Sequence, residues 1–238
     1  MMCVVAHPDE ECFAFGGALA LAAERGIETY VICLTDGQAA THRGDATSGE
    51  ALGKMRRTEL HASCEVLGVT QHELMDYQDA QLEFVDFSVA AGRLVERMRR
   101  FQPEVVITFG GDGAMNTHPD HMMVSMLTTA AFHWAGQAKR YPELGVPHKA
   151  QRLYYLTTSY FLADRQPPMP MPWTARLDIR SVREKKAEAF RRHLSQAPLV
   201  ETTKEVFGKH GAEEFYALVA AAEPQEAKLT TDLFEGLI

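Results

Sequence analysis

Residues 2–25, MCVVAHPDEECFAFGGALALAAER, decide the fold, because a short apolar run passes through a polar turn into a helical pattern. Residues 2–6 are apolar throughout, which is typical of a strand buried on both faces of a sheet. Residues 15–25 have helical periodicity, and Gly26 suits the position that ends a helix. The segment therefore predicts the first βα unit of an α/β fold.

The same alternation continues to about residue 160. Further strands are expected over residues 29–34, 105–109 and 153–157, and helices over residues 49–67, 84–101 and 119–137. This order is typical of a Rossmann-like α/β fold, with a mostly parallel sheet and helices on both faces. In such sheets, ligands bind beyond the carboxyl ends of the strands.

From about residue 160 the pattern changes. Residues 166–173 contain four prolines, so loop or extended chain is expected there. A charged helix is expected over residues 179–193 and a last helix over about 212–222. We therefore expect one domain over residues 1–238, with a core of residues 1–160 and a C-terminal loop and helix extension, residues 161–238, packed on it.

The composition excludes several classes of protein. With 238 residues, 46% of them hydrophobic, the chain is long enough to bury a full core. The net charge of −8 argues against a nucleic-acid or anionic-membrane partner, which needs concentrated basic charge. No apolar run reaches transmembrane length, and the four cysteines form no CxxC pair. A cytoplasmic protein in a reducing compartment is therefore expected.

Two polar clusters follow expected strands. HPDEE at residues 7–11 sets one imidazole beside three carboxylates, and HPDH at residues 118–121 follows the strand expected at 105–109. Closely spaced carboxylates repel one another unless a cation lies among them. Two histidines and one carboxylate form a common catalytic zinc set, with one position left open for water. If the two strands are neighbours, the clusters meet at one edge of the sheet.

Simpler interpretations stay open at this point. A short HPDE run also forms a turn in which the aspartate caps a helix. A protein of a different class, a non-catalytic module that binds a sugar or nucleotide on a Rossmann-like sheet, is a further alternative. The first strand is not followed by G-x-G-x-x-G, so a dinucleotide site is not supported.

With AHPDEE at residues 6–11 and HPDH at 118–121, the sequence resembles the PIG-L/LmbE-like zinc-dependent N-deacetylase family, whose hallmarks are A-H-P-D-D-E and a later H-P-D-H. Supporting similarity follows in the family's order: GGALA at 16–20, TDG at 35–37, RRTEL at 56–60, YQDA at 77–80 and HLSQ at 193–196. The resemblance implies a Rossmann-like fold and removal of an N-acetyl group from an N-acetylglucosamine-type conjugate.

The resemblance also implies a metal site. His7, Glu10 and His121 match the family's zinc ligands, and Asp9 matches the general base that takes a proton from the attacking water. The family's usual second aspartate is Glu10 here, one methylene longer, and an exchange of roles between Glu10 and Asp9 stays open. The same ligand types suit Fe(II), Co(II) and Mn(II) as well as Zn²⁺.

The second motif supplies the remaining catalytic residues that the resemblance implies. His118 matches the residue that stabilises the tetrahedral intermediate or protonates the departing amine, and Asp120 would orient it. A carboxylate hydrogen-bonded to that imidazole would raise its pKa and fix its tautomer. Asn116 stands where some relatives carry a tyrosine that helps hold the oxyanion, so His118 or the metal would supply more of the stabilisation.

The residues that select the substrate are the least defined. Arg56 and Asp79 fall where relatives contact the substrate, and we place Asp36 at the rim of the same pocket. Arg56 and Asp79 suit sugar hydroxyls, although each equally suits a surface ion pair. The expected partner is a small-molecule N-acetylated amino-sugar conjugate. An amidase that cleaves a larger N-acyl or thiol conjugate is the alternative. Family members often form trimers or hexamers, so the resemblance allows a homo-oligomer.

Overall fold

The computed structural model describes residues 1–161 and 167–237. The strands of this part of the chain form a seven-stranded sheet in the order β3-β2-β1-β4-β5-β7-β6. They are β1 (Met2–Val5), β2 (Tyr30–Thr35), β3 (Gln71–Tyr77), β4 (Val105–Phe109), β5 (Arg152–Thr157), β6 (Ala175–Asp178) and β7 (Glu213–Ala221).

The helices of the described ranges alternate with these strands along most of the chain. They are α1 (Glu10–Phe13), α2 (Gly16–Glu24), α3 (Gly49–Leu67), α4 (Phe87–Phe101), α5 (Pro119–Ala135), α6 (Arg183–Arg191) and α7 (Ala197–His210). Short 3-10 helices add η1 (Leu82–Phe84), η2 (Ala114–Asn116), η3 (Arg180–Val182) and η4 (Leu194–Gln196). None of the helices in these ranges combines the length and the apolar composition that a membrane span requires.

The sheet is mixed but mostly parallel. β1 pairs in parallel with β4, β2 with β3 and β4 with β5, whereas β7 runs antiparallel to β5. β1, β2 and β4 are buried along their whole length, because their side chains are apolar on both faces. The α/β class with a mostly parallel sheet is therefore confirmed.

The chain divides into two compact units, each assembled from distant segments of the sequence. The first unit contains Met1–Val4, Gln81–Arg176 and Phe215–Ile238, and the second contains Val5–Ala80 and Leu177–Glu214. The expectation of a single domain with an extension from residue 161 stays a prediction.

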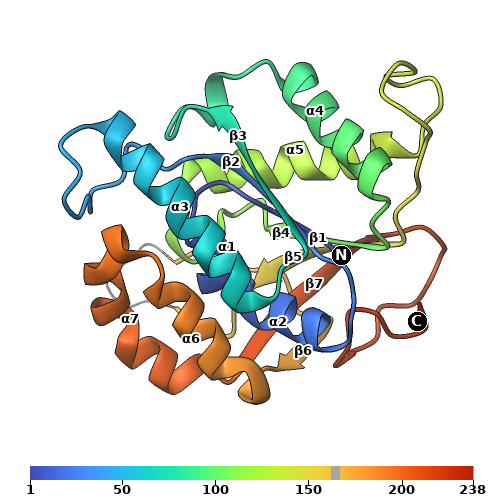
Figure 1. Ribbon diagram of the computed structural model, residues 1–238. Coiled ribbons are helices and arrows are strands. Elements are labelled where there is room, and N and C mark those ends of the chain that lie inside the picture. Colours follow the sequence, from blue (N-terminus) through green and yellow to red (C-terminus); the bar gives the residue numbers. More distant parts are fainter. Residues whose placement is uncertain (162–166, 238) are drawn as a thin grey trace. The chain divides into compact units, whose positions relative to one another are not determined.

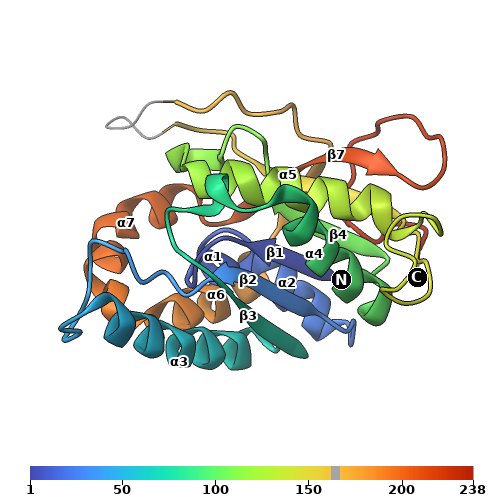
Figure 2. The same cartoon turned by 90° about the horizontal axis from the view of Figure 1, so that it is seen from above.

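In the first unit, α4 and α5 pack along each other (Figures 1 and 2). α4 begins after Asp86, whose Oδ1 accepts a hydrogen bond from the Val89 amide at 2.9 Å. Near its other end, the buried Arg99 donates to the carbonyl of Ala135 at 3.0 Å. This bond ties the end of α5 to α4, so the helix that carries the HPDH motif is held at its far end.

In the second unit, α3 and α6 pack side by side (Figure 1). α3 begins after Ser48, whose Oγ accepts from the Ala51 amide at 3.1 Å. It ends at Gly68, which has a φ of 78° and takes the left-handed conformation that glycine adopts readily. The helix expected over residues 49–67 is therefore confirmed at both ends.

The C-terminal region differs from the sequence prediction. The last helix expected over residues 212–222 is wrong, because β7 occupies this stretch, and α7 precedes it without having been predicted. Pairing with β5 decides the conformation: Phe215 lies opposite Thr157, and Tyr216 opposite Leu156. Aromatic residues suit such a pleated, half-buried surface. Of the proline-rich stretch, residue 166 lies outside the described residues, and residues 167–173 are neither helix nor strand, as expected.

β3 was also missed by the sequence analysis. It stands first in the strand order, so only β2 pairs with it. Met75 is its one fully buried residue, and the rest of the QHELMDY stretch is polar or partly exposed. An edge strand of this kind carries no apolar run, which is the signal that revealed the central strands.

Candidate active site

The AHPDEE motif lies where the chain leaves β1 and enters α1. Asp9 precedes α1 with a φ of 97°, in the left-handed region that non-glycine residues rarely adopt. Its side chain makes no capping hydrogen bond, so the interpretation of HPDE as a simple capped turn is wrong. Such a backbone conformation destabilises the folded state by on the order of 1–3 kcal/mol, and residues that adopt it cluster at functional sites.

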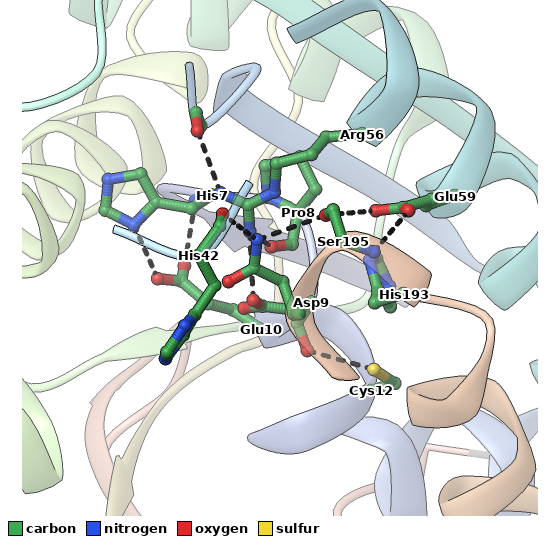
Figure 3. A network of polar contacts seen from close by, with 12 residues as sticks. His7, Pro8, Asp9, Glu10, Cys12, His42, Arg56, Glu59, His193 and Ser195 are labelled. Carbon is green, nitrogen blue, oxygen red and sulfur yellow. Dashed lines mark hydrogen bonds and ion pairs between the residues drawn. The ribbon is translucent and has the colours of Figure 1, made fainter. Parts of the chain in front are cut away.

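Arg56 of α3 holds the Asp9 carboxylate (Figure 3). Its Nη2 lies 2.9 Å from Asp9 Oδ2 and also donates to the carbonyl of Pro8, while Nη1 donates to the carbonyl of Gly37 at 3.0 Å. Burial raises the pKa of Asp9 to about 6, although the charge of Arg56 opposes the shift. A carboxylate with this pKa is matched to proton transfer near neutral pH.

Arg56 and Asp36, both predicted to contact the substrate, form hydrogen bonds with other residues of the second unit. Arg56 is only 3% exposed and lies against the turn that carries Asp9. Asp36 follows β2, and its Oδ2 accepts from Arg57 Nη2 at 3.1 Å, while its Oδ1 is buried without a hydrogen-bond partner. Substrate contact by Arg56 and by Asp36 stays a prediction.

Residue 37 must be glycine because the Arg56 guanidinium lies too close to leave room for a Cβ atom there. A Cβ atom at residue 37 would lie 1.9 Å from Arg56 Nη1, and the φ of Gly37 is +65°. We expect Gly37→Ala to displace the guanidinium and to lower the free energy of unfolding by about 2 kcal/mol or more, because hydrogen bonds of a charged group are lost. Urea unfolding measures this loss.

Gly26→Ala is the matched control for that experiment. Gly26 has a similar φ of +71°, but nothing lies within 4 Å of its hypothetical Cβ. This variant therefore reports the backbone cost alone, which is about 1 kcal/mol. Equal losses for the two variants would contradict the role of Gly37 in seating Arg56.

His7 and Glu10 form a second buried pair in the same turn (Figure 3). His7 is 8% exposed, Glu10 is 7% exposed, and His7 Nδ1 lies 2.8 Å from Glu10 Oε1. Glu10 Oε2 accepts from the backbone amides of Ala6 at 2.8 Å and His7 at 3.0 Å. The longer side chain of glutamate is thus turned back onto the end of β1, which keeps Oε1 beside the imidazole.

Asp79, which comes two residues after β3, contacts the other side of the His7 ring. Its Oδ1 lies 2.9 Å from His7 Nε2, and its Oδ2 accepts from the Ala39 amide at 2.9 Å. Burial alone would raise the pKa of Asp79, but the hydrogen bond and charge of His7 hold it below its ordinary value. The second unit thus brings together His7, Glu10 and Asp79, and beside them the pair of Asp9 and Arg56.

The third carboxylate of the motif has a role that was not predicted from the sequence. Glu11 and His193 are both fully buried, and Glu11 Oε1 lies 2.8 Å from His193 Nε2. Ser63 Oγ donates to the same oxygen at 2.5 Å, and the amide of Asp9 donates to Glu11 Oε2 at 2.8 Å. Glu11 therefore anchors the strained backbone of Asp9. The available signals were the extra glutamate of HPDEE and the HLSQ sequence.

The charge states of this pair follow from their mutual contact. Burial would raise the pKa of Glu11, but the charge and hydrogen bond of His193, with the Ser63 hydroxyl, hold it below its usual range. Burial would lower the pKa of His193, but Glu11 outweighs it and the pKa is raised. Each partner thus favours the charged form of the other, and removal of either leaves the other buried without this contact.

Glu11, Cys12 and His193 also offer ligand atoms within 4.8 Å of one another. Burial and the neighbouring carboxylates raise the pKa of the Cys12 thiol well above its usual value. The contacts of Glu11 with His193 and with the Asp9 amide give Glu11 and His193 a structural role in supporting the turn.

The HPDH motif lies in the first unit, at the start of α5. The Asp120 amide donates to His118 Nδ1 at 3.1 Å, so the proton of the neutral His118 ring is on Nε2. Asp120 is 1% exposed, and its Oδ1 accepts from the Leu82 amide at 3.2 Å. The hydrogen bond described between the two residues thus comes from the Asp120 backbone amide, whereas the Asp120 carboxylate was expected to make it.

His121 has the tautomer that suits a metal ligand. Its Nδ1 lies 3.0 Å from the carbonyl of Gly113 and so donates to it, which places the lone pair of the neutral ring on Nε2. The ring stacks on Phe109 at the end of β4, with centroids 4.2 Å apart and an interplanar angle of 7°. His121 is 5% exposed and is therefore held rigidly.

The sequence of this chain is similar to those of known proteins. The family model described as GlcNAc-PI de-N-acetylase matches residues 2–132. The mycothiol S-conjugate amidase of Streptomyces coelicolor is 31% identical over 65% of this chain and 59% of that protein. The 1D-myo-inositol 2-acetamido-2-deoxy-alpha-D-glucopyranoside deacetylase of Rhodococcus jostii is 28% identical over 100% of this chain and 98% of that protein.

A solved structure shares the fold. The N,N'-diacetylchitobiose deacetylase of Pyrococcus horikoshii superposes with a TM-score of 0.73 at 20% identity, covering 92% of this chain and 82% of that chain. The family model spans more than half of the sequence and includes both the AHPDEE and the HPDH motifs. The chain therefore belongs to the PIG-L family of GlcNAc-PI de-N-acetylases.

Proposed function

We propose that this protein is a metal-dependent hydrolase that removes the N-acetyl group from an N-acetylglucosamine-type conjugate. The observation that carries the proposal is the Asp9 carboxylate. It contacts Arg56, and burial raises its pKa to about 6. A base poised near neutral pH and placed beside His7 and Glu10 is what water activation requires. The names of the relatives support the substrate class.

The donor set fits a divalent ion. His7, Glu10 and His121 would hold it, because two imidazoles and a carboxylate suit Zn²⁺ and also Fe(II), Co(II) or Mn(II). His121 presents Nε2 as its lone-pair nitrogen, and the Oε1 of Glu10 lies on the Nδ1 side of His7. When bound, the ion supplies Lewis acidity, which lowers the pKa of water toward about 7 and polarises the amide carbonyl.

The protein's own groups account for the proton movements. Asp9 takes a proton from the attacking water and returns it to the amide nitrogen as the C–N bond breaks, which leaves acetate and a free amine. His118 donates through Nε2–H to the carbonyl oxygen as negative charge develops there, a contribution of about 3 kcal/mol for a donor of this kind. Asp120 holds the His118 ring through its backbone amide.

Removal of the metal tests this function. We expect the purified protein to carry about one divalent ion per chain, to release acetate from an N-acetylglucosaminyl-inositol, and to lose turnover on chelation. Added Zn²⁺ should restore the activity. Metal content by mass spectrometry and free amine by fluorescence measure the two quantities. Full turnover by the metal-free protein would overturn the proposal. Absence of any metal binding by the purified protein would also overturn it and would favour a simple sugar-binding module.

An amidase that acts on a larger conjugate is the second candidate, because the 31% identical relative is a mycothiol S-conjugate amidase. The two functions share the cleaved bond and differ in the acid that is released. A deacetylase releases acetate, whereas an amidase releases a larger acid from a thiol conjugate. Mass analysis of both products on matched substrates distinguishes them.

The cellular setting is part of the same proposal. The cysteines of the described chain, Cys3, Cys12, Cys33 and Cys64, are all free and buried. Unpaired thiols are typical of a reducing compartment, which supports the cytoplasm as the place where the protein acts. Its partner there would be the small-molecule substrate.

A further inference from the structure

His7 touches a carboxylate through each of its ring nitrogens. Nδ1 lies 2.8 Å from Glu10 Oε1, and Nε2 lies 2.9 Å from Asp79 Oδ1. A neutral imidazole carries one proton and one lone pair, on different nitrogens that face opposite sides of the ring. The partner that takes the proton therefore decides which nitrogen is left for a metal ion.

The position of Glu10 decides between the two nitrogens. Glu10 Oε2 is anchored by the amides of Ala6 and His7, which leaves Oε1 as the oxygen beside His7 Nδ1. His7 Nε2 is on the far side of the ring from that oxygen. A single ion bound by both residues must therefore lie on the Nδ1 side of His7.

The position of Asp79 allows it to accept a hydrogen bond from Nε2 of His7. Its Oδ2 is fixed by the Ala39 amide at 2.9 Å, and its side chain is 7% exposed, so Oδ1 is held in place against His7 Nε2. Asp79 is thus an acceptor whose two oxygens are both held in place.

We propose that Asp79 is a positioning residue of the metal centre: it accepts the Nε2–H proton of His7 and so leaves the Nδ1 lone pair of His7 for the metal ion, beside Glu10. This inference rests on the proposed function and gives Asp79 a role in place of the substrate contact predicted from the sequence. Carboxylates that hold a metal-ligating histidine in this way contribute about 10- to 100-fold to metal affinity.

Metal affinity distinguishes the two roles of Asp79. For Asp79→Ala, we expect the dissociation constant for Zn²⁺, measured by competition with a chromophoric chelator, to rise about 10- to 100-fold. Asp79→Asn keeps an acceptor oxygen, so it should recover part of the affinity. Gln78→Ala is the matched control, because Gln78 comes from the same loop and contacts Gln38. Its affinity should equal that of the wild type.

The outcomes separate this inference from the function on which it rests. Wild-type affinity in Asp79→Ala, together with a raised KM, would overturn the positioning role and restore the substrate contact, while the hydrolase proposal would stand. Failure of the wild-type protein to bind Zn²⁺ would overturn the proposed function itself. The metal affinities decide between these two results, and the KM of Asp79→Ala then identifies the substrate contact.

A second measurement needs no variant. In the zinc-loaded wild-type protein with ¹⁵N-labelled histidine, long-range proton–nitrogen spectra identify which nitrogen of each ring carries a proton. We expect His7 to carry its proton on Nε2 and to bind the metal through Nδ1, whereas His121 shows the reverse because Nδ1 donates to Gly113. A proton on Nδ1 of metal-bound His7 would overturn the inference.

Discussion

Replacing Asp9 by asparagine is expected to lower kcat by about 10²- to 10⁴-fold while the protein still binds its metal ion. The amide of asparagine cannot accept the proton of the attacking water, but it has nearly the same shape as the carboxylate. Arg56 still finds an oxygen at this position, so the turn should keep its conformation. Steady-state kinetics and metal analysis of the same preparation measure the two effects.

Asp45→Asn is the control for this substitution. Asp45 lies in the exposed loop before α3, and the same chemical change there should leave kcat unchanged. Wild-type kcat in Asp9→Asn would refute the role of Asp9 as general base. Loss of the metal ion from Asp9→Asn would instead assign Asp9 as a ligand and support the exchange of roles between Asp9 and Glu10.

Replacing Glu11 by alanine is expected to lower the free energy of unfolding by about 3–5 kcal/mol. The variant leaves the raised-pKa imidazole of His193 buried without its carboxylate, and it removes the acceptors of the Ser63 hydroxyl and the Asp9 amide. An uncompensated buried charge costs far more than an exposed one. Urea unfolding of the metal-free protein isolates this effect from metal binding.

Glu65→Ala provides the matched control, because it also removes a glutamate that contacts a histidine. Glu65 Oε1 lies 3.4 Å from His61 Nε2 on the surface of α3, where the two side chains are 69% and 56% exposed. An exposed pair contributes little, so the loss should stay within about 0.5 kcal/mol. Similar small losses in both variants would contradict the structural role of the Glu11–His193 pair.

Local signals explain why much of the fold could be predicted. The helix expected over residues 49–67 matches α3, because its start and its closing glycine are properties of neighbouring residues. The strand expected over residues 105–109 matches β4, because a short apolar β-branched run has few alternatives in a buried sheet. Both motifs of the candidate site follow such well-marked strands.

The missed elements depend on pairing between distant segments. β3 is mostly polar and forms its strand by pairing with β2. β7 forms its strand by pairing with β5, which lies far from it in the sequence. Residues 213–221 contain alanines that also suit a helix, so their own preference does not decide the outcome. Strand pairing across the fold overrides local propensity in such stretches.

The order of apolar strands and polar turns, read from neighbouring residues alone, determined the α/β class, the two histidine motifs and the family. Tertiary structure alone decided which partner each buried polar side chain has: Arg56 for Asp9, His193 for Glu11 and Asp79 for His7. The physical reason is that a buried polar group must be satisfied by whatever the fold brings within hydrogen-bond distance. Those partners lie tens to hundreds of residues away, where sequence spacing carries no information about contact.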